Sequence, residues 1–60
     1  GQITRLLASG PKAIPDMVSS MYAGVDRRLW PAAERSVLAH LIDLRDRGLA
    51  RQRNEIWEAV

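Results

Sequence analysis

The sequence feature that most constrains the fold is a helical run of apolar residues after Pro31. Four of them recur at spacings of three and four, which places them on one face of a helix: Val37, Leu38, Leu41 and Leu44. Pro31 suits the first helical turn, where its missing N–H has no partner to lose. Gly48 can adopt the left-handed conformation that ends a helix, and Arg45 and Arg47 suit the last turn. The pattern predicts a long helix that begins at Pro31 and stops before Gly48.

The residues after Gly48 alternate in a way that is typical of a hairpin. Residues 49–53 and 55–60 form two candidate strands around a turn near Asn54. Because side chains alternate along a strand, Trp57 and Ala59 share one face, and the other face carries Ile56, Glu58 and Val60.

Two shorter helices are expected before Pro31. Ile3, Leu6 and Leu7 have helical spacing, and Gly10-Pro11 then ends that helix. The second helix has an apolar stripe of five residues: Ile14, Met17, Val18, Met21 and Tyr22. Pro15 and Asp16 suit its first turn, whereas Ala13 is a cap position poorer than Ser or Asp by about 1 kcal/mol.

The segment between the second and third helices contains one further turn. Asp26 can cap a single turn through Arg27, Arg28 and Leu29, and Trp30 is expected outside helical geometry because it precedes Pro31. Three helices followed by a terminal hairpin form the winged helix-turn-helix plan. We therefore expect a mainly α fold, with three helices plus a wing, in a single domain over residues 1–60.

The residue inventory limits the chemistry of the chain. There is no cysteine and one histidine, His40, whereas a structural zinc site needs four protein ligands. We expect no metal site and no catalytic residue in this chain, with His40 at the edge of the third helix's apolar stripe. The lack of cysteine is compatible with a reducing cytosol, so a cytoplasmic location is expected. No run approaches the roughly 18 apolar residues of a membrane span.

Arginines in the wing are candidates for nucleic-acid contact. The net charge is only +2, so the basic residues matter where they cluster. Arg47, Arg51 and Arg53 lie around Trp57. The arginines could bind phosphates, and the Trp57 ring could stack against a base. The alternative is a solvated hairpin whose arginines discourage pairing at the strand edge.

The outward face of the third helix favours protein contact over DNA reading. It carries Arg35, Ala39, Ile42, Asp43 and Asp46, so two carboxylates would meet phosphates there. Three apolar residues are not required by a three-helix core: Trp30, Ala39 and Ile42. They are candidates for contact with another domain or a second subunit, although Trp30 could instead cap the core.

Two segments resemble a known family. The first segment is residues 29–41, which read Leu-Trp-Pro-Ala-Ala-Glu-Arg-Ser-Val-Leu-Ala-His-Leu and are followed by Leu44 and Gly48. The second segment is residues 14–18, which read Ile-Pro-Asp-Met-Val and are followed by Met-Tyr-Ala-Gly-Val-Asp at 21–26. They resemble the small C-terminal winged-helix domain of the lactamase-β-2-like branch of metallo-β-lactamase-fold hydrolases. The resemblance runs from Gln2 to the hairpin. The chain departs from the family pattern at four positions. It has Ala13 where Thr is usual, Gly24 where Asp is common, Trp30 where His is expected and Ile42 where a charged residue is expected.

The resemblance implies a longer parent protein with an N-terminal αββα hydrolase domain that binds one or two zinc ions. The His-x-His-x-Asp-His signature of that domain does not occur in this chain, so no catalytic or metal-binding residue is carried over. The leading hypothesis is a non-catalytic accessory domain that packs against the hydrolase domain and helps shape its substrate cleft. The alternatives are a nucleic-acid-binding module, either the RNA-gripping part of a nuclease or a DNA-binding regulator, and a homodimerisation element. The substrate of the parent and the origin of Gly1, natural or left by a tag, stay open.

Overall fold

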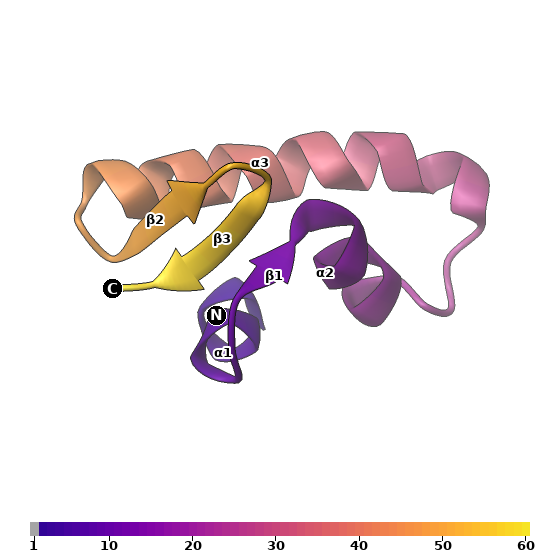
Figure 1. Ribbon diagram of the computed structural model, residues 1–60. Coiled ribbons are helices and arrows are strands. Elements are labelled where there is room, and N and C mark those ends of the chain that lie inside the picture. Colours follow the sequence, from indigo (N-terminus) through magenta and orange to yellow (C-terminus); the bar gives the residue numbers. More distant parts are fainter. Residues whose placement is uncertain (1) are drawn as a thin grey trace.

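The computed structural model describes residues 2–60, so Gly1 lies outside the described residues. The elements follow in the order α1 (Gln2–Ala8), β1 (Lys12–Ala13), α2 (Ile14–Met21), the 3-10 turn η1 (Arg27–Leu29), α3 (Trp30–Asp46), β2 (Ala50–Arg53) and β3 (Ile56–Ala59). Figure 1 shows α3 lying along one side of the molecule, with the strands, α1 and α2 on its other side. Three helices and a terminal hairpin confirm the predicted winged-helix fold class.

The wing is the larger part of a three-stranded antiparallel sheet. The strand order is β1-β3-β2, so the hairpin strand β3 is central. Gln52 on β2 and Lys12 on β1 are both register partners of Trp57. The hairpin turn contains Asn54 with φ of 56°, a conformation that asparagine tolerates, in agreement with the predicted turn. The strand β1 was not predicted from the sequence, because two residues carry no periodicity and pair only where the fold brings them beside β3.

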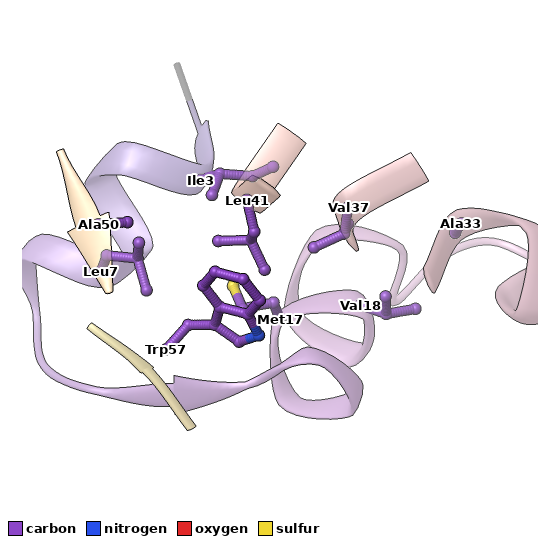
Figure 2. Close-up of a cluster of buried hydrophobic side chains, with 9 residues drawn as sticks. All are labelled: Ile3, Leu7, Met17, Val18, Ala33, Val37, Leu41, Ala50 and Trp57. Carbon is purple, nitrogen blue, oxygen red and sulfur yellow. The ribbon is translucent and has the colours of Figure 1, made fainter. Parts of the chain in front are cut away.

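The core is one cluster to which all three helices and the wing contribute. Its buried members are Ile3, Leu7, Met17, Val18, Ala33, Val37, Leu41, Ala50 and Trp57. Figure 2 shows Trp57 at the centre of this cluster, with Leu41 beside its ring. Because the indole comes from the wing and Leu41 from α3, the core joins the hairpin to the helices.

The buried face of α3 differs from the predicted stripe at one position. Val37 and Leu41 are buried and Leu44 is partly buried, as expected, but Leu38 is 37% exposed and Ala33 is buried instead. The prediction for Leu38 is therefore wrong. Helical residues are about 100° apart, so Leu38 and Val37 lie on opposite sides of Leu41. The covered face of α3 is the side of Val37.

The start of α3 corrects the expectation for Trp30, which adopts helical φ and ψ of −64° and −37°. Its backbone N–H donates to the carbonyl of Arg27, so η1 passes directly into α3. The indole N–H donates to the carbonyl of Val25 at 3.1 Å, and the Arg27 guanidinium lies 5.6 Å from the ring centroid. These contacts offset the preference of a residue before proline for extended geometry.

The end of α3 confirms the predicted role of Gly48. This glycine has a positive φ of 77°, its N–H donates to the carbonyl of Arg45, and the N–H of Leu49 donates to the carbonyl of Leu44. The two bonds form a Schellman motif, which satisfies carbonyls that the helix leaves free. The motif turns the chain sharply from α3 into β2.

Gly48→Ala is expected to lower the free energy of unfolding by about 1–2 kcal/mol, because an L-residue is strained in the left-handed region. Gly24→Ala is the matched control: its φ is not left-handed and its added Cβ meets nothing within 4 Å. That change should stabilise the chain by about 0.4–1 kcal/mol through the unfolded state. Urea unfolding of both variants measures the difference, and equal effects would contradict the assigned cap.

Candidate functional site

The three candidate arginines near the wing are exposed, and each has a carboxylate neighbour. The side chains of Arg47, Arg51 and Arg53 are 62%, 60% and 78% exposed. Arg51 forms an ion pair with Glu58, whose Oε1 is also 4.0 Å from Nη2 of Arg53, and Arg47 is 3.4 Å from Asp43. The carboxylates offset much of the positive charge that phosphates would meet on this surface.

Trp57 does not belong to an exposed site. Its side chain is 1% exposed, and the Arg45 guanidinium covers the ring at 5.7 Å from the centroid. Nη1 of Arg45 also donates to Oε1 of Gln52 at 3.4 Å. The expectation that Trp57 stacks a base is therefore wrong, because the face of β3 that carries it packs on the core. Among the candidate nucleic-acid residues, only the arginines are accessible.

A hollow lies between α1, the end of α2 and α3, and we name it the α1–α3 groove. Its volume is about 380 Å³, and its lining residues are Gln2, Ile3, Thr4, Met21, Tyr22, Ser36, Val37, His40, Asp43, Leu44 and Arg47. Ile3 and Val37 are buried and form an apolar floor. A smaller hollow of about 230 Å³ also borders α1. The molecule is therefore hollowed on the side of α1.

The rim of the α1–α3 groove is polar because of one row of residues on α3. Ser36, His40, Asp43 and Arg47 follow one another at helical spacing, next to the apolar stripe. Helical periodicity predicted His40 at the edge of this stripe, but the groove was not predicted. The row of polar residues is visible in the sequence, but the helix α1 that forms the opposite wall is positioned only by tertiary packing.

The three residues proposed for interdomain contact do not form one patch. Trp30 is partly buried and packs against the core, whereas Ala39 and Ile42 are exposed, Ile42 by 36%. Nine residues separate Trp30 from Ala39, which is about half a turn of rotation about the helix axis. Trp30 therefore caps the core, and Ala39 and Ile42 remain as candidates for contact with another surface.

Asp26 caps η1, as predicted from the sequence. Its Oδ1 accepts a hydrogen bond from the backbone N–H of Arg28 at 2.9 Å, and its Oδ2 lies 3.1 Å from Nη2 of Arg28. The Arg28 side chain, and then its backbone N–H, hold the pKa of Asp26 below the usual value. The stabilisation is present above the ordinary carboxyl pKa and is lost as the pH falls through the lowered one. Because both side chains are exposed, solvent screens the effect.

Residues 2–60 show neither a cluster of metal-binding side chains nor a membrane-spanning helix. This part of the chain contains no group of three or more His, Cys, Asp or Glu side chains placed to hold a metal ion. Within the same residues, no helix is both long enough and apolar enough to cross a membrane.

The three helices, the small sheet and the hairpin define a winged-helix domain. The family model of the beta-lactamase associated winged helix domain matches residues 13–57, which is more than half of the chain. The chain belongs to this family, and the resemblance inferred from residues 14–48 is confirmed. No curated protein and no solved structure gives a significant match.

Proposed function

We propose that this chain is a non-catalytic accessory domain that packs against a zinc-dependent metallo-β-lactamase-fold hydrolase domain of the same protein. The observation that carries the proposal is membership in a winged-helix family associated with beta-lactamase. In this proposal the zinc ions and the catalytic residues belong to the hydrolase domain. The winged-helix domain contributes a wall of the substrate cleft.

The α1–α3 groove is the surface that best suits this contact. It combines a buried apolar floor with polar groups on its rim, the mixture found in ligand sites and in non-obligate interfaces. Tyr22, Ser36 and His40 supply hydrogen-bonding groups to a substrate or to the neighbouring domain. The wing is less suitable, because its arginines are already close to carboxylates. Nucleic-acid binding by the wing is the alternative.

His40 is the reporter for a test of this contact. In the protein that carries both domains, modification of His40 by diethyl pyrocarbonate should be about tenfold slower than in the 60-residue chain, because interface cores exclude water. Peptide mapping by mass spectrometry distinguishes His40 from histidines of the hydrolase domain.

The matched control is Arg53→His, which places a second reporter on the exposed wing. It should react at the same rate in both proteins. Equal rates for His40 in both proteins would show that the groove is not covered. Protection of the wing reporter alone would move the contact to the wing.

A further inference from the structure

The side of α3 opposite the core carries a regular exposed row of residues, which we name the α3 outer stripe. It consists of Ala32, Arg35, Ala39, Ile42 and Asp46, all of them exposed. Their spacings alternate between three and four residues, the heptad repeat by which helices pair. In Figure 1 the strands, α1 and α2 all lie on the other side of α3, so this side is uncovered.

We propose that the α3 outer stripe pairs with the same stripe of a second copy of the chain, with the two helices antiparallel. The stripe is arranged symmetrically about a point between His40 and Leu41. Arg35 and Asp46 are equally far from that point along the chain, and so are Ala39 and Ile42. A two-fold contact requires that when residue i meets residue j, j also meets i. The antiparallel pair therefore places Arg35 opposite Asp46 and Ala39 opposite Ile42, each contact being made twice.

The charges of the stripe support this arrangement. Among residues 2–60, neither Arg35 nor Asp46 takes part in an ion pair, whereas Asp43 pairs with Arg47 at 3.4 Å. Asp46 lies in the last turn of α3, where the helix dipole is unfavourable for a carboxylate. In the antiparallel dimer, Asp46 meets Arg35 of the second copy in the N-terminal half of that copy's helix. The Arg35 guanidinium of the second copy then offsets the unfavourable dipole of the carboxylate's own helix.

The sizes of the central residues also fit. Ala39 is small and permits close approach of the helices, and Ile42, which is 36% exposed, can pack over it. A second copy that presents this same row in the opposite direction places small against large and positive against negative, and this self-complementarity favours a second copy as the occupant. The inference is independent of the proposed function, because the α1–α3 groove lies on another flank of α3.

The expected dimer is weak. A single helix pair buries less than the roughly 1,200 Å² at the lower end of stable interfaces, so the dissociation constant should be on the order of 100 μM. Sedimentation equilibrium of the 60-residue chain at low salt should show a concentration-dependent rise in average mass toward that of a dimer. Added salt should lower the average mass, because salt partly screens the two ion pairs.

Charge reversal provides the decisive experiment. Arg35→Asp and Asp46→Arg each place like charges opposite one another at both ends of the stripe, so each variant alone should associate at least tenfold more weakly. An equimolar mixture of the two variants restores both ion pairs, because each copy then supplies the charge that the other needs. The mixture should therefore associate about as strongly as the parent chain.

The control is Arg53→Asp, which makes the same change of charge on the wing and should leave association unchanged. Circular dichroism checks that all variants fold. A parent chain that stays monomeric at millimolar concentration would overturn the proposal. So would single variants that associate normally, or a mixture that does not recover.

Discussion

Trp57→Ala should leave the chain largely unfolded at room temperature. The side chain is 1% exposed and is one of the largest in the core, and removing a buried aromatic ring costs about 3–5 kcal/mol. A 60-residue domain has a small core, and its total stability is expected near the lower end of roughly 5–15 kcal/mol. The cation–π contact with Arg45 is lost as well. Trp57 therefore accounts for a large share of the net stability.

The position of Trp57 in the sheet adds to this effect. Its strand β3 pairs with both β1 and β2, so loss of the ring loosens the contact between the whole sheet and the helices. Far-UV circular dichroism and urea unfolding measure the change. The matched control is Ile56→Ala, the neighbouring residue on β3, which is 41% exposed and should cost about 1 kcal/mol or less. Equal effects of the two substitutions would show that Trp57 is not the centre of the core.

Leu41→Ala is the second substitution with a large expected effect. Leu41 has no exposed surface and lies beside the Trp57 ring, so its truncation should cost about 2–5 kcal/mol. In a domain of this size, each kilocalorie per mole shifts the thermal midpoint by roughly 4–8 °C. A fall of about 10 °C or more is therefore expected in a thermal melt followed by circular dichroism.

Leu38→Ala is the control for Leu41→Ala on the same helix. The side chain has the same chemistry but is 37% exposed, so its truncation leaves a smaller cavity and should lower the midpoint by only a few degrees. A drop at Leu38 as large as that at Leu41 would restore the stripe expected from periodicity alone. It would also show that another element covers this flank of α3.

The limits of the helices and of the hairpin could be predicted because the interactions that set them are local. The Schellman motif at Gly48 and the side-chain cap at Asp26 involve residues only a few positions apart in the chain. The left-handed turn at Asn54 depends on the same short range. The family could also be predicted from the sequence, since the matching segments are continuous stretches of the chain.

The candidate site could be predicted only in part from the sequence. Periodicity shows which residues share a face, but it does not show which faces are covered. It correctly placed Trp57 on one side of its strand, yet only the packing of β3 on the core made that side the buried one. It placed His40 at the edge of a stripe, yet the α1–α3 groove exists because α1 forms the other wall.

The sequence by itself determined the three helices, the hairpin, the C-terminal end of α3 and the winged-helix class, because these follow from hydrogen bonds and side-chain spacing within a few residues. The tertiary structure alone decided that Leu38 is exposed and that β1 joins the sheet. Each of these outcomes depends on contacts between segments far apart in the chain. Their free energies are comparable to the local preferences that they override, so only the assembled core decides between them.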